Sequence, residues 1–126
     1  MKGTRRLVDN DSYIGQLRQF SLEASSVLTV CTGPALLART GLIDNQPATT
    51  NKRALGWVKS VNPKVNWIEK ARRGVTENSY TSSGVSAGMD MVLGILADRF
   101  IHKFTSQVAN EIEYNWQEDA SIDPFH

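Results

Sequence analysis

A short apolar run, Val27–Val30, restricts the fold of this chain more than any other feature. The run is rich in strand-forming residues and nearly continuously apolar, which is typical of a strand covered on both faces. After Cys31, the segment "TGPALLARTG" predicts a helix with Pro34 tolerated in its first turn and Gly41 as its C-terminal stop. The order strand, cysteine, helix therefore predicts a parallel sheet that is covered by helices.

The remaining segments alternate between helical and extended patterns. Asp11 or Ser12 can cap a helix, and a long amphipathic helix is expected from Ser86 onward. The stretch "ARRGVTENSYTSSG" predicts two extended arms around a turn at Glu77–Asn78. The other expected elements are a short helix in "NKRALGWVKS", a strand in "KVNWI" and a last helix from about Lys103 to Tyr114.

Composition excludes several classes of function. The chain has 126 residues, enough for one domain with its own core, and its 14 basic and 13 acidic residues give a net charge of +1. That balance offers no field for nucleic acid or an anionic membrane, so the pairs Arg5–Arg6 and Arg72–Arg73 are interpreted as solvated surface. The longest apolar stretch is too short to span a bilayer. A single cysteine predicts no disulfide and no zinc site, and we expect a cytoplasmic protein without a cofactor.

Cys31 is the candidate nucleophile. A thiol at the start of a helix faces unpaired backbone N–H groups and the positive end of the helix dipole, and both favour the reactive thiolate. The N–H groups of Thr32 and Gly33 could stabilise negative charge that develops on a substrate. A free cysteine also packs well as a small apolar core residue. Position alone leaves both interpretations open.

Three motifs in this order, "VCTGPALLARTG", "ATT" and "SSGVSAGMD", resemble the ThiJ/PfpI superfamily of class I glutamine amidotransferase-like proteins. The resemblance runs from about Gly3 to Phe125. It implies a flavodoxin-like three-layer α/β/α sandwich with a mostly parallel sheet and a catalytic Cys31 on a strained strand-to-helix turn. It also implies an oxyanion site at Thr32 and Gly33, and a pocket lined by Asn51, Ser83, Gly84 and Val85.

The activity that the resemblance implies is closest to that of an isonitrile hydratase, in which the Cys31 thiolate attacks a small electrophilic carbon. Two alternatives stay open: glyoxalase or deglycase chemistry on 2-oxoaldehydes, and a non-catalytic redox sensor or stress protein. Many relatives have a histidine after "ATT", where this chain has Asn51, so a Cys–His dyad is not assumed. Neither His102 nor His126 is expected to replace it. A homodimer with a small-molecule substrate is expected.

Further expectations concern the limits of the chain and single residues. The superfamily domain begins with several strands that have no counterpart before Lys2, so residues 1–126 are expected to form one N-terminally truncated domain. Close backbone approach near Cys31 is expected to require glycine at Gly33 and Gly84. Asp90 is interpreted as structural, and Glu111 and Glu113 as exposed. Trp116 and Phe125 are expected to anchor the tail.

Overall fold

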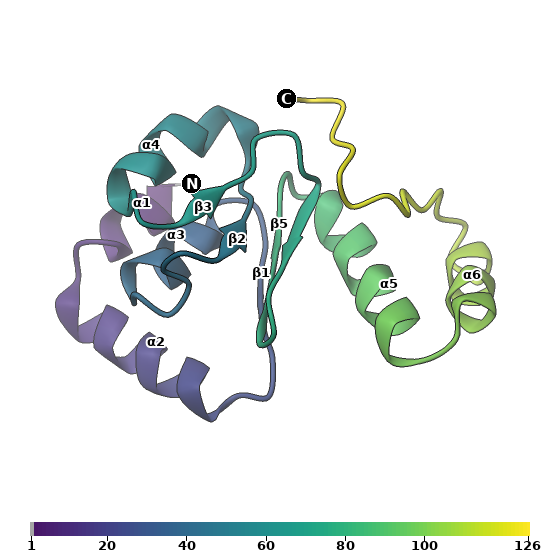
Figure 1. Ribbon diagram of the computed structural model, residues 1–126, viewed down its shortest axis with the longest axis horizontal. Helices are drawn as coiled ribbons and strands as arrows, with labels where there is room; N and C mark the ends of the chain where they lie inside the picture. The colour runs from purple at the N-terminus through teal and green to yellow at the C-terminus, as the bar shows by residue number, and fades with distance from the viewer. Residues whose placement is uncertain (1) are drawn as a thin grey trace.

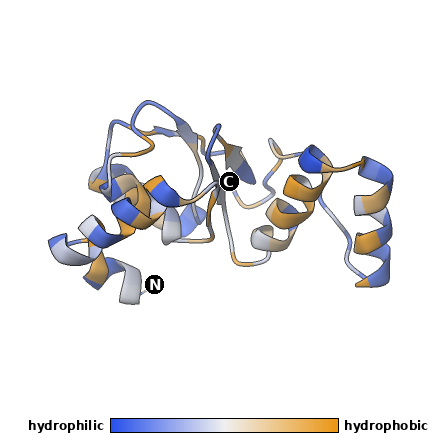
Figure 2. Ribbon diagram, turned by 90° about the horizontal axis from the view of Figure 1, so that it is seen from below, coloured by the Kyte–Doolittle hydropathy of each residue, from blue (hydrophilic) through white to orange (hydrophobic). Residues whose placement is uncertain are grey.

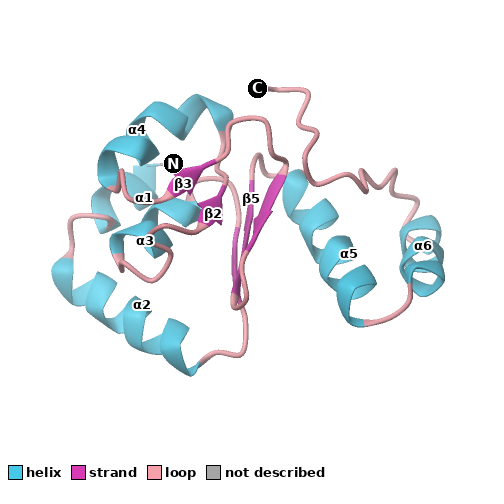
Figure 3. Ribbon diagram, in the orientation of Figure 1, coloured by secondary structure: helices cyan, strands magenta, loops and turns pink. Residues whose placement is uncertain are grey.

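Helices lie on both sides of a small sheet in the computed structural model, which describes residues 2–126 (Figure 1). Helices α1 to α4 cover one side, and α5 and α6 lie on the other, so the chain has the expected three-layer α/β arrangement (Figure 3). The elements are α1 (Lys2–Leu7), α2 (Asp11–Glu23), β1 (Val27–Thr29), α3 (Gly33–Arg39), β2 (Pro47–Ala48), the 3₁₀ helix η1 (Lys52–Ala54), α4 (Leu55–Val61), β3 (Asn66–Trp67), β4 (Arg73–Val75), β5 (Ser79–Ser82), α5 (Ala87–Arg99) and α6 (His102–Glu111).

The central sheet has the strand order β1-β5-β4, in which β1 and β5 are parallel and β4 is antiparallel to β5. Its register places Thr29 opposite Thr81, so both parallel strands end at the same edge. A second parallel pair, β2 with β3, lies beside β4. Gly74 permits this approach, because a Cβ there would lie 2.9 Å from the Ala48 Cα and 2.8 Å from the Thr81 Oγ1. Strands β1, β3, β4 and β5 and the turn at Glu77–Asn78 lie where the sequence predicts them, whereas β2 was not expected.

The buried core lies between the sheet and helices α3 and α4. Helix α3 begins with Pro34 in its first turn and ends before Gly41, whose φ of 82° permits the stop that the sequence predicts. Helix α2 contributes no buried residue, and 73% of Phe20 is exposed, so its apolar face does not serve the core of this chain. The core side chains are Leu37, Ala38, Ile43, Ala48 and Val65 in one cluster and Ala35, Ala54 and Val58 in another.

An apolar groove of about 460 Å³ is lined by residues of β1, α5 and α6 and the segments next to them. Figure 2 shows hydrophobic residues along α5. Leu28 and Val30 line the groove from the β1 side, and they are 45% and 39% exposed. The expectation of a strand buried on both faces is therefore wrong for β1 in this chain. Within residues 2–126, β1 pairs with β5 alone, which leaves its outer edge without a hydrogen-bonding strand. An open edge beside apolar side chains is a surface that favours association.

The C-terminal tail is anchored by a carboxylate and by backbone hydrogen bonds. Asp123 is 1% exposed, and its N–H donates to the Lys70 carbonyl at 3.0 Å. Phe125 is 73% exposed, so the prediction that it anchors the tail is wrong. Trp116 is half-buried against the His102 ring, at 5.5 Å between ring centroids. No helix among the described residues is long and apolar enough to cross a bilayer.

Candidate functional site

Cys31 lies in a tight turn between the end of β1 and the start of α3. Its φ of 62° falls in the left-handed region, which a residue with a Cβ adopts at a cost of about 1–2 kcal/mol. The turn is closed by the Gly33 N–H, which donates to the Val30 carbonyl at 2.9 Å. Such strain persists where the surrounding structure fixes the backbone, and it is found at functional sites more often than elsewhere.

The segment that follows β2 fixes the strained turn. The Thr50 hydroxyl donates to the Cys31 carbonyl at 2.7 Å, and the Asn51 N–H donates to the same oxygen at 3.0 Å. Thr50 is fully buried, so this contact is shielded from water. The hydroxyls of Thr4 and Thr32 lie 3.0 Å apart. Helix α1 and the β2–η1 connection therefore both contact the turn.

The Cys31 side chain is partly exposed and forms no disulfide. This placement distinguishes it from a fully buried core cysteine. The two proposed oxyanion donors differ: the Gly33 N–H already donates within the turn, whereas the Thr32 N–H donates to no acceptor among the described residues. Thr32 is therefore the better candidate donor beside the thiol.

The four residues expected to line a pocket lie in three different places. Asn51 and Gly84 line one polar pocket, and Ser83 lies buried at the edge of the sheet where Cys31 also lies. Val85 is exposed and lines the apolar groove instead. The side-chain oxygen of Asn51 accepts from the Arg53 N–H, so it caps η1. This bond gives the asparagine after "ATT" a structural role.

The expectation that Gly33 and Gly84 are required by close approach is wrong. An added Cβ at Gly84 would meet nothing within 4 Å, and one at Gly33 would lie 3.4 Å from the Thr29 Cβ, an ordinary contact. Neither position has a positive φ. The strain of the turn is carried by Cys31 itself.

The polar pocket, defined here by Asn51, Lys52, Arg53, Gly84, Asp123 and Phe125, has a volume of about 250 Å³. It adjoins the Cys31 turn through Asn51, whose N–H holds the Cys31 carbonyl. Sequence reasoning missed Lys52 and Asp123. Asp123 lies in an aperiodic polar tail, where no pattern of spacing marks it as buried.

A buried cluster of charges supports this pocket. The Arg72 guanidinium reaches Asp90 Oδ2 at 2.6 Å through both Nε and an NH2 nitrogen, and the other Asp90 oxygen accepts from the Gln117 N–H at 2.9 Å. Arg72 also lies 3.9 Å from Asp123 Oδ1. The interpretation of Arg72 as a solvated surface residue is therefore wrong, and Asp90 has a structural role.

Burial and neighbouring charges act against each other in this cluster. Burial by itself lowers the pKa of Arg72, but the hydrogen bond and charge of Asp90 outweigh it and raise that pKa above its usual value. For the acid Asp123 the signs are reversed: burial raises its pKa, but the nearby Ser83 hydroxyl, the Phe125 N–H and the Lys52 charge hold that pKa below its usual value. Burial lowers the pKa of Lys52. Asp123 is therefore a carboxylate at neutral pH.

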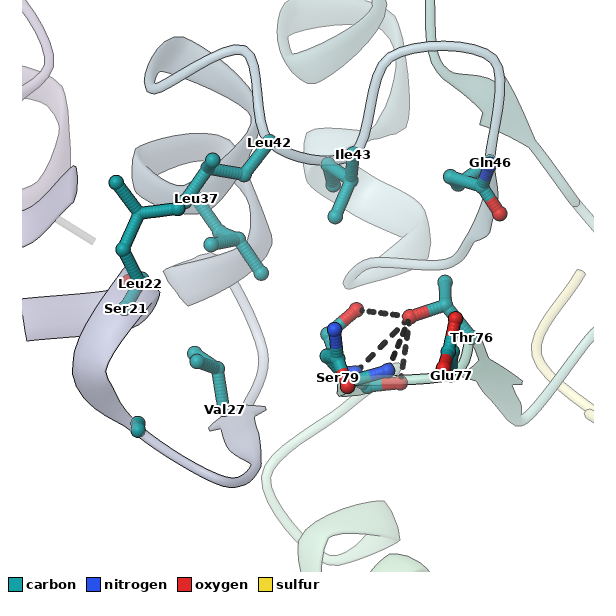
Figure 4. Close-up of a pocket in the computed structure, with 12 residues that line it drawn as sticks. Ser21, Leu22, Val27, Leu37, Leu42, Ile43, Gln46, Thr76, Glu77 and Ser79 are labelled. Atoms are coloured by element: carbon teal, nitrogen blue, oxygen red, sulfur yellow. Dashed lines mark hydrogen bonds between the residues drawn. The ribbon is translucent and has the colours of Figure 1, made fainter.

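Another cleft lies at the opposite edge of the sheet. It measures about 270 Å³ and is lined by Val27, Leu37 and Ser79, among others (Figure 4). Val27 and Ser79 begin β1 and β5, whereas Cys31 follows the other end of β1. One of its polar atoms, Thr76 Oγ1, accepts from the Ser79 N–H at 2.9 Å. The cleft is therefore separate from the thiol.

Other polar side chains are dispersed. His102 Nε2 lies 2.7 Å from Glu118 Oε2, and both side chains are exposed. Glu111 and Glu113 are exposed as expected. Across residues 2–126, no group of three or more His, Cys, Asp or Glu side chains comes together as a metal site would require.

Comparison with known proteins is consistent with this geometry. A sequence profile of the DJ-1/PfpI family matches residues 1–98. An isonitrile hydratase from Pseudomonas putida is 29% identical over 115 residues, which are 89% of this chain and 48% of that protein. The chain therefore spans about half the length of this curated relative.

Solved structures show the same fold. A ThiJ/PfpI family protein from Pseudomonas syringae superposes with a TM-score of 0.75 at 21% identity, covering 98% of this chain and 48% of the other. DJ-1beta from Drosophila melanogaster superposes with a TM-score of 0.69 at 16% identity, covering 92% of this chain and 61% of the other. At these identities the likeness concerns the fold.

Proposed function

The chain belongs to the DJ-1/PfpI family, and on that premise we propose that it forms part of a cysteine-dependent enzyme acting on a small electrophilic carbon. One observation carries the proposal: Cys31, partly exposed, sits at a left-handed φ of 62° in a turn between β1 and α3. Two hydrogen bonds to its carbonyl hold the turn in place. A strained, fixed and accessible thiol suits a nucleophile better than a packing residue.

The reaction we propose is hydration of an isonitrile. The Cys31 thiolate forms a bond to the terminal isonitrile carbon, which takes up a proton to give a thioimidate. Water then adds to this carbon and gives one of its protons to the nitrogen. The hydroxyl loses its proton as the carbon–sulfur bond breaks, which releases an N-substituted formamide and the thiolate and returns the proton taken up in the first step. The Thr32 N–H is the proposed donor to negative charge that develops during these steps.

Two observations favour isonitrile hydration over work on 2-oxoaldehydes. The curated relative from Pseudomonas putida carries the name isonitrile hydratase. The position after "ATT" holds Asn51, which caps η1 and cannot act as a base near neutral pH. Because the chain spans 48% of that relative, we propose that a segment outside residues 1–126 supplies the acid. The proposed working form is a cytoplasmic homodimer, as the family resemblance implies.

The test follows formamide formation by NMR, using the formyl proton of the product from a simple alkyl isonitrile. The chain is assayed alone and extended by the upstream half of the Pseudomonas putida relative, each beside its Cys31→Ser variant. We expect turnover by the extended chain and none by its Cys31→Ser variant. Turnover that survives Cys31→Ser contradicts the proposal. An extended chain that consumes methylglyoxal, a 2-oxoaldehyde, but leaves isonitriles unchanged also contradicts it.

A redox sensor is the second candidate, and the partial exposure of the free Cys31 thiol favours it. Thiols of this kind are oxidised to sulfenic and then sulfinic acid. Mass spectrometry after graded peroxide, run beside the turnover assay, separates the two functions. Sulfinic acid at low peroxide in a chain without turnover favours the sensor, whereas turnover with slow oxidation favours the enzyme.

A further inference from the structure

The polar pocket contains a buried carboxylate oxygen without a hydrogen bond. Asp123 is 1% exposed, and its Oδ2 atom has no hydrogen-bond partner among the described residues. The other oxygen, Oδ1, accepts from the Phe125 N–H at 3.1 Å. Buried polar groups in folded proteins nearly always have partners, and each exception calls for an explanation such as a ligand.

Lys52 balances the charge of this carboxylate without satisfying Oδ2. Its ammonium donates to Thr49 Oγ1 at 2.8 Å and to the Ala71 carbonyl at 2.6 Å. The distance from Lys52 Nζ to Asp123 Oδ2 is 3.5 Å, beyond that of a good charge-assisted hydrogen bond. The Ser83 hydroxyl also lies near this carboxylate and contributes to its lowered pKa. Oδ2 is thus a buried acceptor that the Lys52 ammonium faces only at the long distance of 3.5 Å.

The pocket adjoins the nucleophile. Asn51 lines it and also donates its N–H to the Cys31 carbonyl. Gly84, another lining residue, follows the end of β5 at the edge of the sheet where β1 leads into Cys31. A ligand in the pocket therefore lies beside the turn that carries the thiol.

We propose that this pocket binds the amide group of the reaction product, an N-substituted formamide, with Asp123 Oδ2 as the acceptor for its N–H. This inference rests on the proposed function. A formamide offers one N–H donor, one carbonyl acceptor and one apolar substituent. Those groups match the Asp123 carboxylate, the cationic Arg53 side chain and the Phe125 ring that line the pocket.

The chemistry of the pocket distinguishes product from substrate. An isonitrile has no N–H, so it cannot satisfy Asp123 Oδ2, whereas the formamide and the protonated intermediate can. A site built to accept from an N–H discriminates strongly against an analogue that lacks it. The volume of about 250 Å³ restricts the ligand to small substituents. The C-terminal tail, through Asp123 and Phe125, is then a specificity element of the enzyme.

The experiment uses two probes that differ at one atom. N-propylformamide and N-methyl-N-propylformamide, which lacks the N–H, are titrated separately into the ¹⁵N-labelled chain. We expect N-propylformamide to shift the amide signals of Asn51, Gly84 and Phe125, with an affinity about tenfold higher than that of the methylated probe. Asp123→Asn should abolish this preference.

Exposed positions supply variants that leave the fold intact. Phe125→Ala removes an exposed ring that lines the pocket, and it should weaken binding of N-propylformamide severalfold. Phe100→Ala is the matched control, because Phe100 is also exposed but lies at the end of α5. Melting curves identify any variant that has lost its fold, and the two Phe variants keep the test decisive if Asp123→Asn unfolds.

Several outcomes overturn the inference. The inference fails if the two probes bind with equal affinity or if the amide signals shift only in the apolar groove. It also fails if neither probe binds, as for a pocket filled by water only. Isonitrile turnover is measured on the same samples. Probe binding as described without turnover in the extended chain supports the pocket and refutes the proposed function, whereas turnover without the N–H preference refutes the pocket alone.

Discussion

Replacing Arg72 by methionine should destabilise the chain far more than the same change at its neighbour Arg73. The side chain of Arg72 is 10% exposed and that of Asp90 is 1% exposed, with two contacts of 2.6 Å between them. Arg72→Met leaves the Asp90 carboxylate buried without its cation, while the Gln117 N–H still donates to its other oxygen. Breaking a buried pair costs about 3–5 kcal/mol, and the retained N–H places this case near 3 kcal/mol.

Arg73 is the matched control because it is half-buried and donates to the Glu118 carbonyl at 3.1 Å. Loss of that contact should cost about 1 kcal/mol or less. The double variant Arg72→Met, Asp90→Leu removes both charges and should be more stable than Arg72→Met alone.

The measurement is urea unfolding followed by the fluorescence of the three tryptophans. A loss of about 3 kcal/mol is a large share of the stability of a small domain, so the midpoint should move visibly. Equal losses for Arg72→Met and Arg73→Met would refute the reasoning. A double variant whose loss of stability equals the sum of the losses for Arg72→Met and Asp90→Leu would also refute it, because the buried pair would then not be coupled.

Three further predictions concern the tail, the turn and the groove. Because folding lowers the pKa of Asp123, this carboxylate contributes to stability above its unfolded pKa of about 3.9. The contribution is lost as the pH falls through the folded pKa. Urea midpoints measured from pH 6 to 2 should therefore fall less steeply for Asp123→Asn than for the unchanged chain. Cys31→Gly should equal Cys31→Ala in stability or exceed it by up to about 1 kcal/mol, since glycine adopts the left-handed φ without strain. Lower stability of the glycine variant would argue against strain at this position. Replacing the exposed Val85 and Met89 by serine should reduce binding of an apolar dye while changing stability by about 0.5 kcal/mol or less, and unchanged dye fluorescence would show that the groove is not the association surface.

Local sequence patterns predicted the elements well because their causes are local. The run before Cys31 forms β1, the stop at Gly41 follows from its positive φ, and the turn at Glu77–Asn78 joins β4 to β5. The sharp turn at Cys31 was also predictable, since it lies between a strand and a helix that follow each other closely. The φ of Cys31 itself follows from the contacts of Thr50, which comes 19 residues later.

The sequence by itself determined the α/β class, the strand-to-helix turn and the candidate thiol, because apolar periodicity and turn residues act over a few positions. Only the tertiary structure decided the roles of Arg72 and Asp123 and the identity of the charge that pairs with Asp90. Their ion pairs join residues 18 to 71 positions apart, so whether each charge is solvated or buried depends on which segments meet. The open face of β1 has the same origin: its side chains are apolar, but burial requires a neighbour that residues 2–126 do not place there.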